Sequence, residues 1–397
     1  MSVWDDVVGQ PETVAALRQA VRAAAGIVGA AASGEPDPQQ GGMTHAWLFT
    51  GPPGSGRSVA ARAFAAALQC PRGGCGECAE CRTVRAGTHA DVHRVVPEGL
   101  SIAVQEMRAI VRTAARRPAG GRWQVVIIED ADRLTEAASN ALLKAVEEPP
   151  ARTAFLLCAP STHPDDVSVT IRSRCRVVGL RTPPPDAVAE VLRREGVGPV
   201  DAEWAARAAQ GHVGRARRLA RDADARDRRG AVLALPASLR SLADTLAAAD
   251  GLVGAAEREA GAIAAELDGP EAAALRVALG AGGTGKGTAG TARGTVGVTK
   301  DLERRQKARA TRAQRDALDR ALIDLAGFYR DVLVTQFGAR VPMAHPDVVD
   351  QVVAVAAGLS PAGALARLEA VLACRTELEL NVKPRVAVEA LTMALRG

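Results

Sequence analysis

The sequence predicts an α/β protein in which a parallel sheet comes first and helical segments follow. Two observations carry this prediction. Short apolar runs alternate with helical patterns as far as about residue 180, which is typical of a parallel sheet covered by helices. Beyond that point the pattern is helical and rich in alanine, the strongest helix former.

The first segment, residues 1–180, is expected to contain the sheet. Residues 124–128 form a continuous apolar and mostly β-branched run, as in a strand buried on both faces of a parallel sheet. The other expected strands span residues 46–49, 92–96, 154–158 and 177–178. The expected helices span residues 11–25, 59–68, 102–117 and 135–148. Glycine, serine and proline predict a loop at residues 26–42.

A proline-rich stretch at residues 182–185 marks a domain boundary. Residues 181–228 are expected to form a small helical lid, and residues 229–397 a third, all-helical domain. The expected lid helices span residues 186–195, 201–210 and 214–225. A Gly/Thr/Ala tract at residues 280–297 predicts a flexible loop in the third domain, near 280–300.

Composition limits the classes of protein that the chain can belong to. The 397 residues include 47% hydrophobic residues, enough to bury two or three cores. The net charge of +5 permits an anionic partner but does not identify a nucleic-acid binder. The N-terminus lacks the pattern of a signal peptide, and no apolar segment of membrane-spanning length is found. We therefore expect a cytoplasmic protein without membrane association and without structural disulfides.

A glycine-rich loop follows the first expected strand and precedes a helix, which is the context that a phosphate-binding P-loop requires. In such a loop, backbone N–H groups and the positive end of the helix dipole converge on an anion. The nucleotide-binding candidates are Gly51, Gly54, Ser55, Gly56, Arg57 and Ser58. Arg57 stands where a P-loop has lysine, and its longer, planar guanidinium argues against hydrolysis. A glycine-rich turn without a ligand is the alternative, and occupancy by ATP with Mg²⁺ stays open.

Carboxylates follow the buried strand at residues 124–128, at the sheet edge where α/β proteins bind ligands. In an ATPase of this layout the first acid holds Mg²⁺ and the second positions the attacking water. The usual Asp-Glu order is reversed here, as Glu129-Asp130. A displacement of about 1 Å can cost roughly a hundredfold in rate, so the reversal also argues against efficient turnover.

Four cysteines follow the P-loop helix at short spacings, and they are Cys70, Cys75, Cys78 and Cys81. Thiolates around Zn²⁺ need tight turns between the ligands, and the glycines at 73, 74 and 76 supply them. Four thiolates leave no open coordination position, so we predict a structural zinc knuckle at residues 70–81. A redox-active dithiol is the alternative.

Together these motifs resemble the clamp-loader AAA+ subunits of bacterial DNA polymerase III. The segments that carry the resemblance are Val7-Val8-Gly9-Gln10, the P-loop, the inserted cysteine segment, Glu129-Asp130-Ala131-Asp132, residues 139–150 and Ser173-Arg174-Cys175. The resemblance covers residues 1 to about 225 closely and resumes weakly at 378–385. It implies an AAA+ P-loop domain, a helical lid and a C-terminal helical collar domain.

The resemblance also implies a five-subunit ring that opens a sliding clamp and places it on primed DNA. In such a ring, motor subunits (gamma/tau) hydrolyse ATP beside a rigid stator. Four departures favour the stator: Arg57, the reversed acids, Gly214 near the place of the motor's sensor-2 arginine, and the lack of a long extension after the collar. By the same resemblance, Arg174 is an arginine finger that acts in trans on a neighbour's ATP.

The sequence thus favours a stator subunit, part of a DNA polymerase holoenzyme, that hydrolyses little ATP itself. The implied partners are the gamma/tau and delta subunits and, indirectly, the clamp and primed DNA. Two alternatives stay open. One is an ATP-hydrolysing motor subunit similar to gamma/tau, and the other is a zinc-stabilised interaction module without a role in ATP chemistry.

Overall fold

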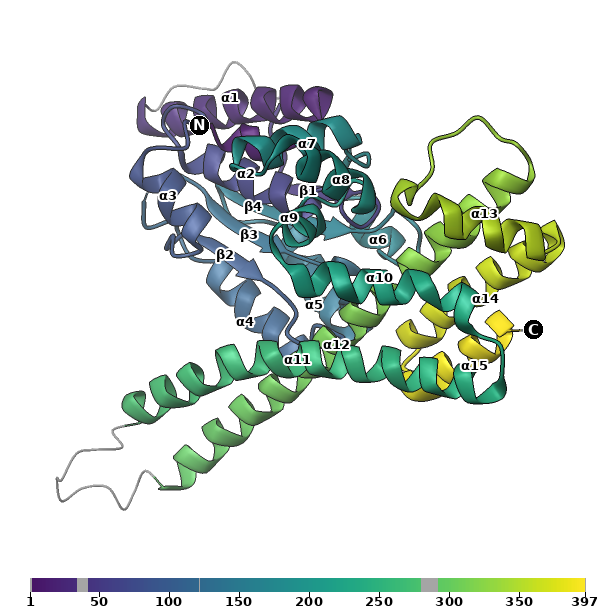
Figure 1. Cartoon of the computed structure of the whole chain (residues 1–397). Helices are drawn as coiled ribbons and strands as arrows, with labels where there is room; N and C mark the ends of the chain where they lie inside the picture. The colour runs from purple at the N-terminus through teal and green to yellow at the C-terminus, as the bar shows by residue number, and fades with distance from the viewer. Residues whose placement is uncertain (1, 34–41, 121, 280–291, 397) are drawn as a thin grey trace. The chain divides into compact units, whose positions relative to one another are not determined.

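The computed structural model describes the chain except residues 1, 34–41, 121, 280–291 and 397. The chain folds into two compact units, Met1–Ala220 and Arg221–Gly397 (Figure 1).

The first unit is built on a five-stranded parallel sheet with the strand order β2-β3-β4-β1-β5. The strands are β1 Ala46–Thr50, β2 Val92–Val95, β3 Gln124–Ile128, β4 Thr153–Ala159 and β5 Arg176–Gly179. Every residue of β1, β3 and β4 is buried, as expected for central strands covered on both faces. The predicted α/β fold class is confirmed.

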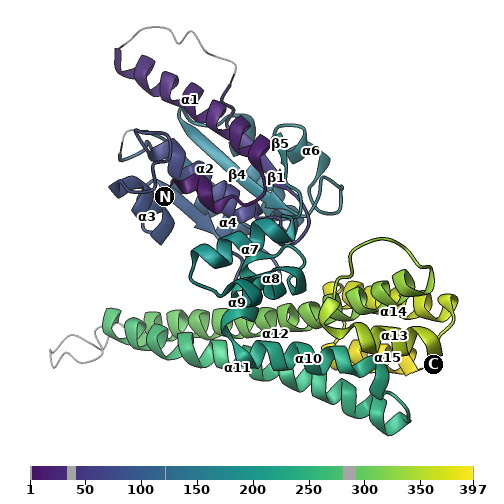
Figure 2. The same cartoon turned by 45° about the horizontal axis from the view of Figure 1, so that its top comes forward.

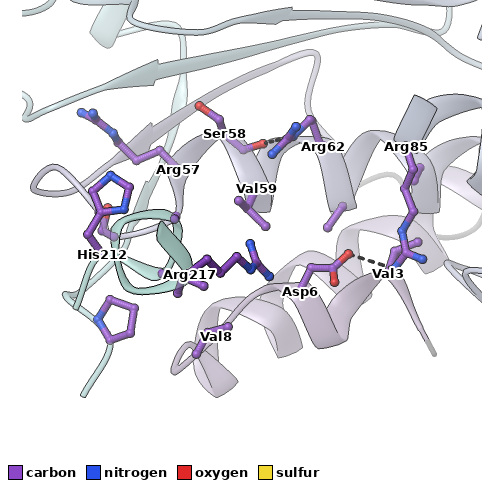
Figure 3. A pocket seen from close by; sticks show the side chains of 18 residues that line it. Val3, Asp6, Val8, Arg57, Ser58, Val59, Arg62, Arg85, His212 and Arg217 are labelled. Carbon is purple, nitrogen blue, oxygen red and sulfur yellow. Dashed lines mark hydrogen bonds and ion pairs between the residues drawn. The ribbon is translucent and has the colours of Figure 1, made fainter. Parts of the chain in front are cut away.

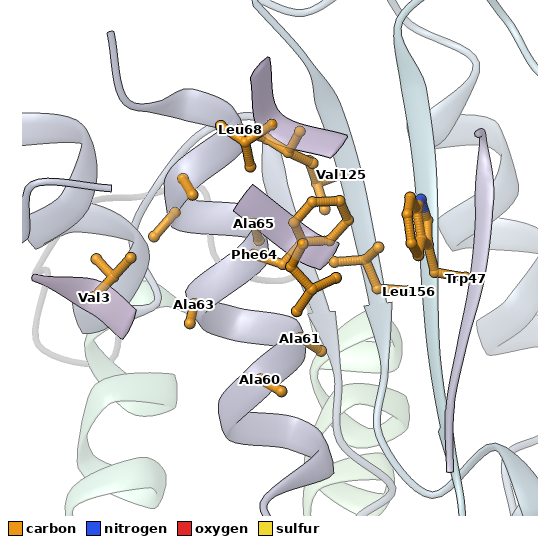
Figure 4. Close-up of a cluster of buried hydrophobic side chains, with 14 of the residues drawn as sticks. Val3, Trp47, Ala60, Ala61, Ala63, Phe64, Ala65, Leu68, Val125 and Leu156 are labelled. Carbon is orange, nitrogen blue, oxygen red and sulfur yellow. The ribbon is translucent and has the colours of Figure 1, made fainter. Parts of the chain in front are cut away.

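Helices cover both faces of the sheet and make a three-layer sandwich. One face carries α1 Pro11–Ser33, α2 Arg57–Gln69 and α3 Ala79–Ala86, and the other carries α4 Val104–Ala114, α5 Glu136–Glu147 and α6 Val169–Arg172. Phe64 of α2 packs edge-to-face on Trp47 of β1, with the ring centroids 4.9 Å apart (Figure 4). Small alanines on α2 allow this helix to approach the sheet closely.

Helix α1 is longer than predicted. The expected loop from residue 26 is wrong over residues 26–33, because α1 continues to Ser33. Ile27 and Val28 pack against the core, and this tertiary contact outweighs the low helix propensity of the neighbouring glycines. Residues 34–41 of the expected loop lie outside the described residues.

Three short helices follow the sheet within the first unit. They are α7 Pro185–Arg194, α8 Pro199–Ala208 and α9 Val213–Arg221, and α7 packs on α8. The predicted third helix extends too far, because it ends at Arg221 and not at 225. Asp222 caps the next helix by accepting a hydrogen bond from the N–H of Ala225 (3.1 Å).

The described part of the second unit is helical, as predicted. Its helices are α10 Ala223–Ser238, α11 Leu242–Ala278, α12 Ala292–Gln336, α13 Val349–Gly358, α14 Pro361–Glu379 and α15 Pro384–Arg396. The long helices α11 and α12 run side by side (Figure 2). The loop predicted at residues 280–297 is wrong from Ala292 onward, where α12 begins, and residues 280–291 lie outside the described residues.

Over the described residues, no single helix combines the length and apolarity needed to cross a membrane. The pair Pro346–Gly358 and Pro361–Glu379, bent by 119°, meets the requirement by length and composition alone.

Candidate functional site

The glycine-rich loop connects β1 to α2, as the sequence predicts. Helix α2 begins at Arg57 after Gly56, which adopts a left-handed conformation (φ 89°) and provides no side-chain cap. Gly54 is also left-handed (φ 87°), and a Cβ atom there would lie 2.8 Å from Cβ of His212. Only glycine fits at position 54, because the segment before α9 lies directly against the loop.

A cavity of about 560 Å³ opens beside this loop (Figure 3). Its lining includes residues 54–59 of the loop and of the start of α2, together with Asp6, Gly214 and three arginines, Arg62, Arg85 and Arg217. Two of these arginines have carboxylate partners: Arg85 Nη2 lies 2.8 Å from Asp6 Oδ2, and Arg217 Nη2 lies 2.6 Å from Glu195 Oε1. The cavity therefore combines uncapped helix N–H groups with cationic side chains, which suits an anion.

Arg57 does not point into the part of the cavity that holds Arg217 and Asp6 (Figure 3). Its Nη1 atom is buried without a hydrogen-bond partner among the described residues. Burial raises the pKa of Asp132 and of Cys158, and the nearby Arg57 charge opposes this rise only in part. The cation that replaces the P-loop lysine thus sits at the carboxyl ends of β3 and β4.

The reversed acids also depart from what an ATPase needs. Arg94 Nε at the end of β2 lies 2.9 Å from Glu129 Oε1, so the carboxylate that the sequence predicts at a metal position already has a cationic partner. Asp130 has a left-handed backbone (φ 53°), which is uncommon for a residue with a side chain. Burial and the neighbouring Asp130 charge raise the pKa of Asp132.

The buried thiol of Cys158 shows that these groups converge. Burial and the Glu129 charge raise the pKa of Cys158 to about 12, and Arg57, Asp130 and Ser58 also act on it. Residues from three separate segments, the P-loop helix, β3 and β4, therefore meet at one edge of the sheet.

Arg174 lies in a different place, just before β5. Its Nη1 donates to the carbonyl of Thr170 (2.9 Å) and to Oγ of Ser173 (3.2 Å). Its Nη2 lies 2.6 Å from Oε1 of Glu147, at the end of α5. Among the described residues, Arg174 is not part of the lining of the cavity beside the P-loop. The side chain of Arg174 is 36% exposed.

The four cysteines come together after α2. Their sulfur atoms all lie within 4.8 Å of one another, and Cys70 Sγ lies 3.6 Å from Cys75 Sγ and 3.7 Å from Cys78 Sγ. A tetrahedron of sulfurs about 2.3 Å from a metal ion has edges of roughly 3.8 Å, close to these separations. The cluster could hold a metal ion, and the sulfurs are too far apart for a disulfide.

Backbone N–H groups prepare two of these thiols for ionisation. Hydrogen bonds from the N–H groups of Glu77 and Cys78 lower the pKa of Cys75 to about 6. Burial opposes ionisation of Cys70, but the N–H groups of Cys75 and Gly74 outweigh it and lower the pKa of Cys70. Burial raises the pKa of Cys78 and Cys81, and a bound cation would offset that cost.

Sequence reasoning missed three residues around these sites. Arg94 pairs with Glu129, Glu147 pairs with Arg174, and His212 lies against Gly54. The only sequence signal for the Arg94–Glu129 pair was that Arg94 is a cation near the end of β2, the strand before β3. Neither Glu147 nor His212 has a spacing that indicates its contact, because both contacts join segments distant in sequence.

The strand order, the P-loop between β1 and α2, and the acids after β3 define an AAA+ type P-loop fold. The predicted resemblance to the clamp-loader subunits of DNA polymerase III is confirmed for part of this unit. Residues 35–184 match the family described as "DNA polymerase III, delta subunit".

Individual relatives agree with this match. The chain is 37% identical over 163 residues to DNA polymerase III subunit delta' of Escherichia coli, covering 40% of this chain and 48% of the relative. It is 34% identical over 174 residues to DNA polymerase III subunit tau/gamma of Haemophilus influenzae, and the match covers 43% of this chain and 22% of the relative. The chain thus matches about half the length of the delta' relative.

A solved structure similar to the chain is a DNA polymerase III gamma subunit-related protein from Thermotoga maritima. It is 15% identical, with a TM-score of 0.34, and the match covers 89% of this chain and 94% of that one.

Proposed function

We propose that the chain is a delta'-type stator subunit of a bacterial DNA polymerase III clamp loader. The observation that carries the proposal is the pairing of Glu129 with Arg94. A carboxylate that is already paired with a guanidinium is a poor ligand for Mg²⁺, because the metal must displace the arginine. Together with Arg57 in the lysine position, this pairing argues for a chain that helps to load the clamp without hydrolysing ATP efficiently.

In this proposal Arg174 serves a neighbouring subunit. A guanidinium beside a transferring phosphoryl group stabilises the charge that develops there, and its loss typically costs on the order of a thousandfold or more. The partners would be gamma/tau motor subunits and the delta subunit, with the sliding clamp and primed DNA reached through the assembly. We assign the complex to the cytoplasm.

The same proposal assigns the four-cysteine cluster to structural zinc. The sulfur separations fit a tetrahedral centre, and four thiolate ligands leave no position for a substrate. Cys70 and Cys81 are buried against the core, so the bound ion would fix the segment after α2. Zinc would add rigidity here and no chemistry.

The P-loop cavity keeps the uncapped start of α2 and the arginines around it. We assign a nucleotide-binding role to the loop residues Gly51, Gly54, Ser55, Gly56, Arg57 and Ser58, and to Glu129 and Asp130, which follow β3 and do not line this cavity. In this proposal ATP binds there through its phosphates without being hydrolysed.

Reconstitution with candidate gamma/tau and delta subunits, clamp and primed DNA tests the proposal. Arg174→Ala should remove most of the ATP hydrolysis at the motor site that receives the arginine, and should slow clamp loading. Arg174→Lys keeps the charge and loses the planar fork, so it should restore only part of the activity. Unchanged ATPase and loading with Arg174→Ala would favour a zinc-stabilised module, and rapid hydrolysis by the isolated chain would favour a motor subunit.

A further inference from the structure

A second hollow lies in the first unit, beside the four-cysteine cluster. It has a volume of about 330 Å³ and is bordered by α1, the N-terminal segment and the loop of residues 72–75, which ends at Cys75 of the cluster. Three arginines line it, Arg18 and Arg22 from α1 and Arg72 from the loop. The described residues of the lining include no aspartate and no glutamate.

The three guanidinium groups have no carboxylate partner in the described parts of the chain. The guanidinium of Arg18 lies over the ring of Trp4, with its carbon 5.8 Å from the ring centroid. Arg18 and Arg22 are one helical turn apart, where like charges destabilise a helix. Nearby Arg85, by contrast, pairs with Asp6 at 2.8 Å. Arg18, Arg22 and Arg72 thus bring three positive charges to one hollow without a carboxylate partner among the described residues.

Hydrogen bonds fix the loop that carries Arg72 against the N-terminal segment. Nε1 of Trp4 donates to the carbonyl of Gly73 (3.1 Å), and Oγ of Ser2 donates to the carbonyl of Gly74 (2.8 Å). The two segments are in close contact, since a Cβ atom on Gly74 would lie 2.7 Å from Val3 Cγ2. The backbone positions of the two elements that carry these exposed arginines are thus fixed before any ligand arrives, which reduces the ordering cost of binding.

The neighbouring cysteines do not cancel this charge. Four thiolates around Zn²⁺ would carry a net charge of −2, whereas the three guanidinium groups carry +3. An excess of positive charge remains even beside a filled metal centre.

We propose that this hollow binds a small polyvalent phosphate compound, such as inorganic pyrophosphate, between Arg18, Arg22 and Arg72. Guanidinium groups match phosphate oxygens with paired, charge-assisted hydrogen bonds. A nucleic-acid backbone would instead be followed by cations along a line, whereas these three surround a single hollow. The site is separate from the P-loop cavity, because Arg18, Arg22 and Arg72 do not line that cavity.

Calorimetric titration with inorganic pyrophosphate tests the site on the full chain carrying Arg57→Gln, which removes the arginine that stands in the P-loop lysine position. We expect binding to persist in this background. Adding Arg18→Gln with Arg22→Gln, or Arg72→Gln alone, should weaken it at least about tenfold, as for the loss of a charge-assisted bond. Arg72→Lys should retain part of the affinity, which shows that the fold is intact.

Arg108 and Arg112 provide a matched control. They are exposed arginines with the same one-turn spacing on α4, and neither lines either cavity. Arg108→Gln with Arg112→Gln should change the affinity less than about twofold. Equal losses in this control, or no binding in the Arg57→Gln background, would overturn the proposal. So would loss of single-stranded DNA binding in the Arg18, Arg22 and Arg72 variants while none of them changes pyrophosphate binding.

Discussion

Arg174 Nη2 lies 2.6 Å from Glu147 Oε1, so the guanidinium proposed to serve a neighbouring subunit is engaged within its own chain. Both side chains are more than one-third exposed, and solvent weakens such a pair. The carboxylate and a neighbour's phosphate would compete for the same guanidinium. Under the proposed function, Glu147 would restrain Arg174 until the neighbouring subunit binds.

The first prediction follows from this competition. Glu147→Gln keeps the shape of the side chain and removes its charge, so Arg174 should reach the neighbour more readily. We expect the ATPase of the reconstituted loader to rise by up to about fivefold, because an exposed ion pair contributes about 1 kcal/mol at most. The effect should shrink at high salt.

Glu148→Gln is the matched control for that experiment. Glu148 is the adjacent residue and is also a glutamate, whereas Arg174 pairs with Glu147. Its substitution should leave the ATPase unchanged. A fall in activity with Glu147→Gln would mean that the ion pair positions Arg174 for the neighbour and does not restrain it.

The second prediction concerns the reversed acids. Asp130→Ala should change the ATPase of the reconstituted loader less than about twofold, because the proposed function assigns no positioning of an attacking water to this chain. The equivalent substitution in the motor subunit should abolish hydrolysis at its site. A large loss of ATPase activity from Asp130→Ala would show that this chain hydrolyses ATP.

The third prediction concerns the metal. Cys75→Ser should reduce the zinc content of the purified chain from about one ion to nearly none, measured by a colorimetric zinc assay, because a structural centre needs all four ligands. The thermal unfolding midpoint should fall with it. Cys175→Ser is the control, since Cys175 lies outside the cluster. Full zinc retention in Cys75→Ser would exclude the proposed ligand set.

The fourth prediction concerns pH and the second unit, where His345 is buried. Arg229 Nη2 lies 2.9 Å from His345 Nδ1, which must therefore accept, and His345 Nε2 lies 3.0 Å from the carbonyl of Asp324. Burial and the Arg229 charge lower the pKa of His345, although the carboxylates of Asp324 and Asp331 oppose this.

The lowered pKa of His345 sets the direction in which stability changes with pH. The unfolded chain takes up the histidine proton first as pH falls, so the free energy of unfolding should decrease below about pH 6.5. The pKa of Asp347 is also lowered, because its pairing with Arg229 outweighs burial, and this adds a loss of stability that begins near pH 4.

Denaturant unfolding at a series of pH values measures this effect. His345→Gln keeps a donor and an acceptor without a titrating ring, so it should flatten the dependence between about pH 4 and 6.5. His163→Gln is the control, because the side chain of His163 is 67% exposed. An unchanged slope in His345→Gln would place the acid sensitivity elsewhere.

Much of the fold could be predicted because its signals are local. The buried strand at Gln124–Ile128 matches the prediction at both ends, since a β-branched run between turns has few other conformations available. The end of α1 was predicted wrongly because packing of Ile27 and Val28, and not helix propensity, extends the helix. The four-cysteine cluster could also be predicted from a local signal, because the short spacing of the cysteines alone brings their sulfurs together.

The sequence by itself determined the order of strands and helices, the P-loop with its arginine, the reversed acids and the cysteine spacing. Each of these features can be predicted from a short stretch of neighbouring residues. Only the tertiary structure decided that Arg94 pairs with Glu129, that Glu147 engages Arg174, and that Arg72 faces α1. The physical reason is that an ion pair or a pocket depends on which side chains the packed elements bring within a few ångströms. Local pattern does not specify that distance.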